Sequence, residues 1–344
     1  MATEVLRQSR VTLQLRSCSV SSFLLRRSRA LETPFQRFRH LDLNHHAGGT
    51  EVSTITDANA AREPERVWGQ HQAALLFLQA MLADPKVRLL RWLDLACGRG
   101  QIVSNLPRAL SLSARSKLHY EGYDVHLDYT REVESRVSQM SLRSYKCEIG
   151  EISNFHKIYQ TQKFDFVTFI NAAHELRPND LALVFSEGIS LLSSRGQFFG
   201  YDVESPNPME LGAIPWARDE IGEILKAICR EFGVPQYQPE ISWWPHQSGT
   251  AWSLHVNRAH MHCAVNELSK RRGSAREAAM KTMRNLLEGK LASVKEQLIV
   301  RTHGPLKAEG DDMEARRRLL NDYWALSHVL AESAESKKDS PRKR

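Results

Sequence analysis

The sequence predicts an α/β protein whose core is a doubly wound, mostly parallel sheet, followed by a hairpin and a helical extension. Strand-like runs alternate with helical stretches of about 10 to 15 residues from residue 63 to residue 232. Two strand-like runs then flank turn residues at 240–256, and only helical periodicity follows residue 261. We therefore expect four segments: a flexible basic leader (1–60), an α/β domain (61–260), a helical extension (261–334) and a basic disordered tail (335–344).

The elements of the α/β domain follow from apolar runs and their spacing. Strands are expected at 89–95, 118–125, 144–149, 164–170 and 196–203. Helices are expected at 64–84, where Pro85 marks the end, and at 101–110, 129–140, 180–192 and 220–232. The runs 240–245 and 251–256 are separated by His246-Gln-Ser-Gly-Thr250, whose turn residues predict a β-hairpin.

The helical extension shows two apolar stripes at helical spacing. Within 276–299 the stripe consists of Met280, Met283, Leu287, Leu291, Val294 and Leu298. After Gly304-Pro305, a second helix capped by Asp311 or Asp312 carries Leu319, Tyr323, Leu326 and Leu330 on one face. These stripes predict helices that pack on the domain or on each other, and a homodimer through them is the alternative.

The net positive charge of the chain is concentrated at its two ends. The 344 residues include 47 Lys and Arg against 40 Asp and Glu, a net charge of +7. Residues 1–50 hold eight arginines and three acids, and 335–344 hold five bases and two acids. The rest sums to −1, so the body lacks the basic groove expected of a duplex reader, and a nucleic-acid partner is unlikely on this ground.

The composition also leads to expectations about the cellular compartment of the protein. No apolar stretch approaches the roughly 18 residues of a spanning helix, so we expect a soluble protein without a membrane span. The five cysteines contain no C-x-x-C pair, which favours a reducing, cytoplasmic setting. The Arg- and Ser-rich N-terminus offers a mitochondrial or other organelle address as the alternative. His255, His260, His262 and Cys263 lack a second ligand pair, so no metal is expected.

The stretch with the clearest chemistry is Trp92-Leu-Asp-Leu-Ala-Cys-Gly-Arg-Gly-Gln101, in which a buried strand meets a glycine turn and then a helix. Glycines let the backbone approach a ligand, and the N–H groups of a helix start attract anionic groups. The next strand ends in Asp124, where a carboxylate can accept hydrogen bonds from both hydroxyls of a ribose. The pattern predicts a ribose-bearing ligand and leaves dinucleotide and S-adenosylmethionine open.

Asp94-Leu-Ala-Cys-Gly-Arg-Gly100 resembles the first motif of class I S-adenosylmethionine-dependent methyltransferases. The dehydrogenase fingerprint G-x-G-x-x-G is not met, because Val103 stands at its third glycine. The resemblance runs across about residues 63–258. It implies a Rossmann-like, seven-stranded sheet whose last strand inserts antiparallel through the hairpin, and it identifies 61–260 as the methyltransferase domain.

The resemblance also implies roles for individual residues. Ala96, Gly98 and Gly100 would shape the loop around the methionine part of the cofactor, and Asp94 would help to fix its amino group. Asp124 would hold the ribose, and Glu151, or its neighbour Glu148, would contact the adenine. Asn171 would lie beside the sulfonium, with His174 and Glu175 at the mouth of the methyl-transfer site. His174 and Glu175 are the titratable pair at this mouth, and His174 is the first candidate if a general base acts there. A structural role for His174, packing over the cofactor or bonding the backbone, is nevertheless the preferred interpretation.

Missing motifs narrow the methyl acceptor. Asn171 is not followed by the Pro-Pro-aromatic sequence of enzymes that act on base amines, and no Pro-Cys nucleophile stands on the fourth strand. A small molecule or a protein side chain remains, with O- or N-methylation favoured over C-methylation. The segments 64–84 and 204–216 and the helices past 261 would set acceptor specificity. The alternatives are a methyltransferase-fold assembly or interaction protein with little or no catalysis and, third, a nicotinamide dehydrogenase.

Overall fold

The computed structural model describes residues 69–206, 210, 212–246, 249–303 and 311–338. The expected leader (1–60), the start of the first helix at 64 and residues 339–344 of the expected basic tail lie outside this range. Among the described residues, no helix combines the length and the apolar character needed to cross a bilayer.

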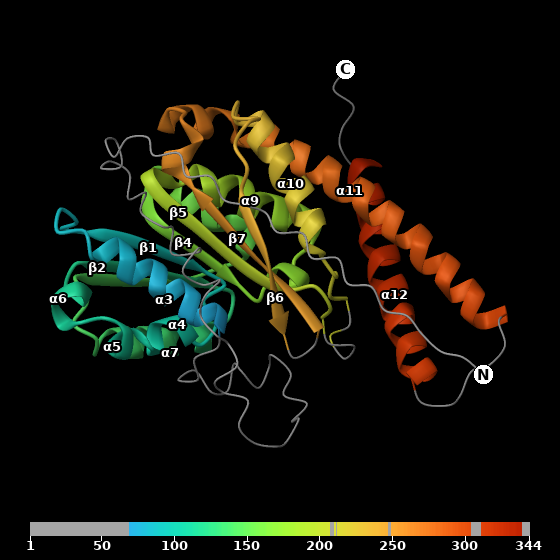
Figure 1. Ribbon diagram of the computed structural model, residues 1–344, viewed down its shortest axis with the longest axis horizontal. Helices are drawn as coiled ribbons and strands as arrows, with labels where there is room; N and C mark the ends of the chain where they lie inside the picture. Colours follow the sequence, from blue (N-terminus) through green and yellow to red (C-terminus); the bar gives the residue numbers. More distant parts are fainter. Residues whose placement is uncertain (1–68, 207–209, 211, 247–248, 304–310, 339–344) are drawn as a thin grey trace, which may run out of the picture. The chain divides into compact units, whose positions relative to one another are not determined.

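The centre of the fold is a seven-stranded sheet in the order β3-β2-β1-β4-β5-β7-β6 (Figure 1). The strands are β1 (Leu90–Leu95), β2 (Leu118–Asp124), β3 (Ser144–Ile149), β4 (Phe164–Ile170), β5 (Leu192–Val203), β6 (Glu240–His246) and β7 (Gly249–Asn257). The first five pair in parallel, and β7 runs antiparallel to both β5 and β6. The predicted seven-stranded sheet with an antiparallel hairpin is confirmed.

Helices lie on both faces of this sheet (Figure 1). The longer ones before the hairpin are α3 (Gly69–Leu82), α7 (Leu127–Val137), α9 (Pro178–Ser190) and α10 (Arg218–Glu231), joined by short helices α4 (Gln101–Ser104), α5 (Leu106–Ala109), α6 (Leu112–Arg115) and α8 (Phe155–Tyr159). The single helix expected at 101–110 is divided at Asn105. Pro107 explains the break, because it has no N–H to donate to the preceding turn.

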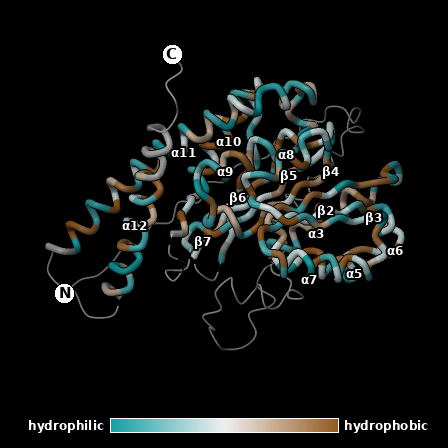
Figure 2. Tube along the Cα trace, turned by 180° about the vertical axis from the view of Figure 1, so that it is seen from behind, coloured by the Kyte–Doolittle hydropathy of each residue, from teal (hydrophilic) through white to brown (hydrophobic). Residues whose placement is uncertain are grey.

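The helical extension consists of α11 (Val265–His303) and α12 (Asp311–Lys338), along which hydrophilic and hydrophobic residues alternate (Figure 2). Helix α11 packs on α9 and α10, and α12 packs on α11. The stripe of α11 that is buried includes Leu268, Ala275, Ala279, Met283 and Leu287. Met280, which we expected on the stripe, is 38% exposed, because the small Ala279 takes the inward position.

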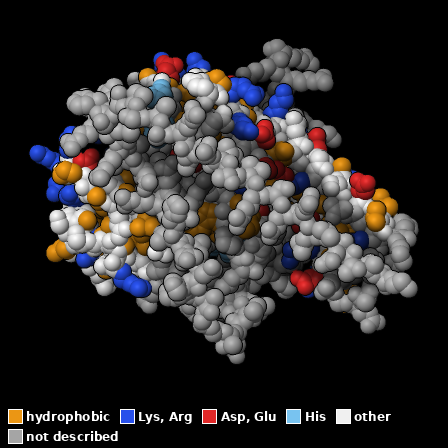
Figure 3. Space-filling model, in the orientation of Figure 1, with side chains coloured by type: hydrophobic (Ala, Val, Ile, Leu, Met, Phe, Trp, Pro, Cys, Tyr) orange, Lys and Arg blue, Asp and Glu red, His pale blue; other side chains and the backbone are white. Residues whose placement is uncertain are grey.

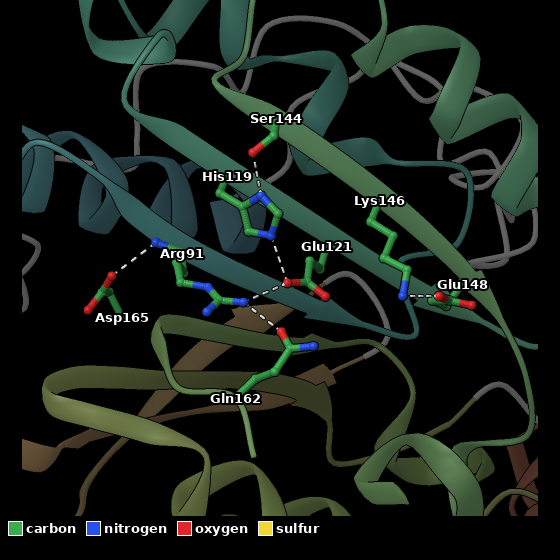
Figure 4. Close-up of polar contacts among 8 residues, drawn as sticks. All are labelled: Arg91, His119, Glu121, Ser144, Lys146, Glu148, Gln162 and Asp165. Atoms are coloured by element: carbon green, nitrogen blue, oxygen red, sulfur yellow. Dashed lines mark hydrogen bonds and ion pairs between the residues drawn. The ribbon is translucent and has the colours of Figure 1, made fainter. Parts of the chain in front are cut away.

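A polar network ties together the amino-terminal halves of four parallel strands (Figure 4). Glu121 on β2 is 2% exposed, and its Oε1 atom lies 3.1 Å from Arg91 Nη2 and 2.7 Å from His119 Nε2. The backbone N–H of Arg91 donates to Asp165 Oδ2 at 2.9 Å, and His119 Nδ1 lies 2.6 Å from Ser144 Oγ. Burial alone would raise the pKa of Glu121, but hydrogen bonds and charges from His119 and Arg91 lower it.

Candidate active site

A cavity of about 450 Å³ lies at the carboxyl ends of β1, β2, β3 and β4. This is where open α/β sheets bind ligands. Its lining includes seven of the nine residues singled out in the sequence: Asp94, Ala96, Gly98, Asp124, Glu151, Asn171 and Glu175. Gly100 and His174 do not line it. The structure therefore brings most of the predicted site together, although the residues come from four different strand ends.

The loop after β1 is built from left-handed backbone. Ala96, Gly98 and Gly100 have φ values of 53°, 52° and 77°. A Cβ atom at Gly100 would lie 3.0 Å from Val133 Cγ2 on α7, so this glycine lets the loop pack against the helix behind it. Gly100 thus shapes the loop without lining the cavity, while Ala96 and Gly98 face it.

Asp124 connects the end of β2 to this loop. Its Oδ2 atom accepts from the backbone N–H of Gly98 at 2.8 Å, and its Oδ1 atom accepts from the backbone N–H of His126 at 2.9 Å. Only 7% of the residue is exposed, yet it lines the cavity. Each carboxylate oxygen keeps a further lone pair for a ligand donor, so the acid is held in place before any ligand binds.

Asp94 lies at the bottom of the cavity in a hydroxyl network. Its Oδ1 atom accepts from Thr168 Oγ1 at 2.6 Å, and its Oδ2 atom accepts from the Tyr120 hydroxyl at 3.3 Å. Burial raises the pKa of Asp94 to about 7, with a further contribution from the charge of Asp124, while the two hydroxyls oppose the shift. Asp94 is therefore a carboxyl group that changes charge near neutral pH.

Glu151, and not Glu148, faces the cavity. Glu151 follows Gly150 at the end of β3, and its carbonyl oxygen accepts from the Tyr123 hydroxyl at 2.8 Å. Glu148 instead forms an ion pair with Lys146 on the same strand (Figure 4). The structure thus separates the two acids that the sequence left as alternatives for one position.

Asn171 follows β4 with a left-handed φ of 56°. Its backbone N–H donates to the carbonyl oxygen of Tyr201 at 2.9 Å. The side-chain Oδ1 atom is buried and has no hydrogen-bond partner among the described residues, although the residue lines the cavity. A buried acceptor without a partner costs free energy, so a ligand that satisfied it would be favoured.

His174 is 2% exposed and lies behind the cavity wall. Its Nδ1 atom lies 2.7 Å from Asp202 Oδ1, and its Nε2 atom lies 3.5 Å from Glu210 Oε2 and 3.8 Å from Glu175 Oε1. Burial would lower the pKa of His174, but the charge and hydrogen bond of Asp202, with help from both glutamates, raise it to about 9. With this pKa the imidazole is protonated at neutral pH, which favours the structural role of His174 over that of a general base.

Several lining residues were not singled out as site residues in the sequence. They include His71 from α3, Gln101 and Ile102 from α4, Val125, His126 and Tyr129 near the start of α7, Ile152, Leu176 and Glu210. His71 and Glu210 fall in two of the three parts of the chain that were expected to set acceptor specificity, 64–84 and 204–216. Cys97 also lines the cavity, but burial raises the pKa of its thiol well above the ordinary value, so it remains protonated.

The comparisons with known proteins agree with this geometry. Residues 86–233 match a family model described as "Methyltransferase domain". A search of the curated proteins found no match.

Two solved structures with a similar fold are remote in sequence. Magnesium protoporphyrin IX methyltransferase (ChlM) from Synechocystis PCC 6803, with bound SAM, is 15% identical, with a TM-score of 0.41 over 66% of this chain and 92% of that one. N-methyltransferase NodS from Bradyrhizobium japonicum WM9, in complex with S-adenosyl-L-homocysteine, is 11% identical, with a TM-score of 0.39 over 58% and 96%.

The family match runs from β1 to α10. It therefore contains the glycine loop and the acid at the end of β2, the two features by which the sequence resembles its relatives. Residues 86–233 are therefore a methyltransferase domain, in keeping with the resemblance of the Asp94 to Gly100 motif to class I S-adenosylmethionine-dependent methyltransferases.

Proposed function

We propose that the cavity holds S-adenosylmethionine in a fixed orientation. The main support for this proposal is the hydrogen bond from the Gly98 N–H to Asp124, which holds the carboxylate beside the glycine loop. Asp124 accepts from the ribose hydroxyls, and Asp94 with Ala96 and Gly98 faces the methionine end. Glu151 and the apolar side chains of Val125 and Ile152 face the adenine. The cavity volume of about 450 Å³ falls in the range typical of small-molecule sites.

We further propose that the acceptor is a small molecule or a protein side chain that enters between Glu175 and Glu210. These two acids line the cavity together with Asn171 and Leu176, and no Lys or Arg occurs among the described lining residues. An acidic wall favours an acceptor that carries positive charge, so an amine is favoured over a hydroxyl group. Positive and negative side chains are interspersed over the described part of the face in Figure 3, in keeping with a compact acceptor and not a nucleic-acid duplex.

Different residues would orient the acceptor, remove its proton and hold the carboxylates in place. Bound S-adenosylmethionine supplies an electrophilic methyl group on a sulfonium. The side chains at the Asn171 end orient the acceptor nitrogen in line with that methyl group. Glu175 or Glu210 takes the proton that an ammonium acceptor must lose, and His174, already protonated, holds both carboxylates in place.

A labelling experiment tests this proposal for any acceptor that a cell contains. Lysate is separated on cation- and anion-exchange resins, and each fraction is incubated with the protein and methyl-labelled donor. Label is expected in the cation-exchange fraction, and it should survive mild base, which releases methyl esters. Label only in anionic fractions would overturn the amine acceptor. No transfer to any fraction, together with no donor binding by calorimetry, would overturn the methyltransferase function.

One observation favours the alternative of an interaction protein. Helices α11 and α12 expose large apolar side chains, including Ile299, Val300 and Met313. Because α11 also covers buried residues of the domain, deletion of the helices would damage the fold, and point changes are the better test. If Ile299→Glu with Val300→Glu abolishes a cellular role that an Asp124→Ala variant retains, the interaction function is supported.

A further inference from the structure

The segment between β5 and α10 connects the acceptor side of the cavity to the rest of the fold. We use the name acceptor loop for its described residues Glu210 and 212–217. Glu210 lines the cavity, and its carbonyl oxygen accepts from the backbone N–H of Ala213 at 3.2 Å. The backbone N–H of Ile214 donates to the carbonyl oxygen of His174 at 2.8 Å. The loop is thus bonded directly to the residue behind the cavity wall.

Lys290 of α11 contacts the other end of this loop. Its Nζ atom donates to the carbonyl oxygen of Pro215 and lies 2.6 Å from Glu220 Oε2. It also lies 5.7 Å from the centroid of the Trp216 ring, within the range of a cation–π contact. Glu220 Oε2 accepts in turn from the backbone N–H of Ala217 at 2.7 Å. One ammonium group therefore joins the helical extension to the loop and to the first turn of α10.

The acceptor loop also has neighbours on β7 and on α12. Trp216 is 1% exposed, and its carbonyl oxygen accepts from Trp252 Nε1 at 3.0 Å, which fixes the loop against the sheet. On the outer side, a Cβ atom at Gly212 would lie 3.4 Å from the ring of Trp324 on α12. Among the described residues, Lys290 is the charged side chain of the extension that contacts both the loop, at Pro215, and the first turn of α10, at Glu220.

We infer that Lys290 is a positioning residue for methyl transfer: from α11 it holds the acceptor loop so that Glu210 stays beside His174 on the acceptor side of the cavity. The inference rests on the proposed function, because it assigns the helical extension a part in that reaction. It also explains why a charged side chain that is only 22% exposed lies at this helix–loop junction. The cofactor side, built from the β1 and β2 ends, does not involve Lys290.

The test compares Lys290→Met with the wild-type chain, using the acceptor fraction found by labelling. We expect kcat/KM for the acceptor to fall about tenfold to a hundredfold, chiefly through KM, because small displacements of positioning groups have effects of this size. The Kd for S-adenosylmethionine should not change. Lys290→Arg should restore most of the activity, since a guanidinium can keep the Glu220 ion pair and stack on Trp216.

A second readout does not depend on activity. The His174 imidazole is followed by NMR as a function of pH, because Glu210 contributes to its raised pKa, along with Asp202 and Glu175. Lys290→Met should lower this pKa. The matched control is Lys295→Met on the same helix, whose ammonium lies 5.9 Å from the ring centroid of Tyr323 on α12. It should lower stability without changing KM or the His174 titration.

The outcomes separate the inference from the proposed function. A folded Lys290→Met variant with wild-type acceptor KM and wild-type His174 titration overturns the inference. If that variant does not fold, Glu220→Gln takes its place, since it removes the ion pair yet keeps an oxygen for the Ala217 N–H. It must then shift the His174 titration in the same direction. If the wild-type chain transfers no methyl group, the proposed function fails, and with it the part of Lys290 in methyl transfer. The His174 titration then still decides whether Lys290 holds Glu210 beside His174.

Discussion

The backbone N–H of Gly98 donates to Asp124 Oδ2 at 2.8 Å, so the turn after β1 is bonded to the last residue of β2. These two positions are 26 residues apart in the sequence and lie at the ends of two neighbouring strands, β1 and β2. The bond aligns the carboxylate with the wall of the cavity before a ligand arrives. Preorganisation of this kind strengthens binding because less ordering remains to be done.

Asp124→Ala should weaken S-adenosylmethionine binding by about 2 to 3 kcal/mol, the value of hydrogen bonds to a charged group, which corresponds to roughly 30- to 150-fold in Kd. Isothermal titration calorimetry measures the change. Asp128→Ala is the matched control, since this exposed acid lies on the first turn of α7 and does not line the cavity. Equal affinities for the two variants would contradict the ribose role of Asp124.

Gly100→Ala should destabilise the fold by about 1 to 2 kcal/mol, because it places a Cβ atom on a left-handed residue and against Val133. Gly289→Ala is the opposite case. Gly289 lies within α11, and a Cβ atom there would meet nothing within 4 Å, so alanine should stabilise the chain by about 0.5 to 1 kcal/mol. Urea unfolding measures both, and a shift of the same sign in the two variants would contradict these roles for the two glycines.

Asp94 should make cofactor binding depend on pH. Its pKa of about 7 lies above the unfolded value, so the folded chain binds a proton there and loses stability as pH rises from about 4 to about 7. The amino group in the methionine part of the cofactor, which Asp94 is expected to help fix, is positively charged and needs the carboxylate form of Asp94. The affinity for S-adenosylmethionine should therefore rise with pH up to about 7 and then level off.

Calorimetry at several pH values follows this dependence. Asp94→Asn cannot ionise and should bind more weakly with a flat pH profile. If the asparagine variant retained the wild-type profile, the proton would have to be assigned to another group.

Glu121→Gln should cost about 2 kcal/mol of unfolding free energy at pH 7, because Arg91 and His119 lose a charged partner in a buried network. The pKa of Glu121 is lowered in the fold, so its stabilisation is present above the unfolded pKa and is lost as pH falls through the folded pKa. The difference in unfolding free energy between Glu121→Gln and wild type, measured by urea unfolding, should disappear at acidic pH. Glu148→Gln, in a more exposed pair with Lys146, should stay within about 0.5 kcal/mol of wild type.

Patterns local to the chain predicted much of this fold. All seven strands are where apolar runs indicated them, because alternation and burial are properties of short segments. Strand β5 begins at Leu192, before the expected 196, since pairing with β4 continues across an irregularity near Gly196 that periodicity does not reveal. Helix α11 begins at Val265, before the apolar stripe at 276–299, because Leu268 and the small Ala275 make its first buried contacts.

The site could be predicted only where its residues belong to a motif. The Asp94 to Gly100 stretch and Asp124 have a characteristic spacing, and the structure places them together. Glu210 and His71 reach the cavity from distant segments, and no spacing rule connects them to it. The charge state of His174 depends on Asp202, 28 residues away, so a neutral histidine and one protonated at neutral pH look the same in the sequence.

The contacts of Lys290 also bear on the time at which the protein becomes active during its synthesis. Translation delivers the glycine loop and Asp124 early, and the sheet can close only after β7 has inserted beside β5. The acceptor loop gains its ammonium support later still, when α11 has left the ribosome. A nascent chain that ends before residue 290 would thus lack the ammonium group that we infer to hold Glu210 beside His174. Efficient use of the acceptor would therefore wait until α11, which follows the whole sheet in the sequence, has been translated.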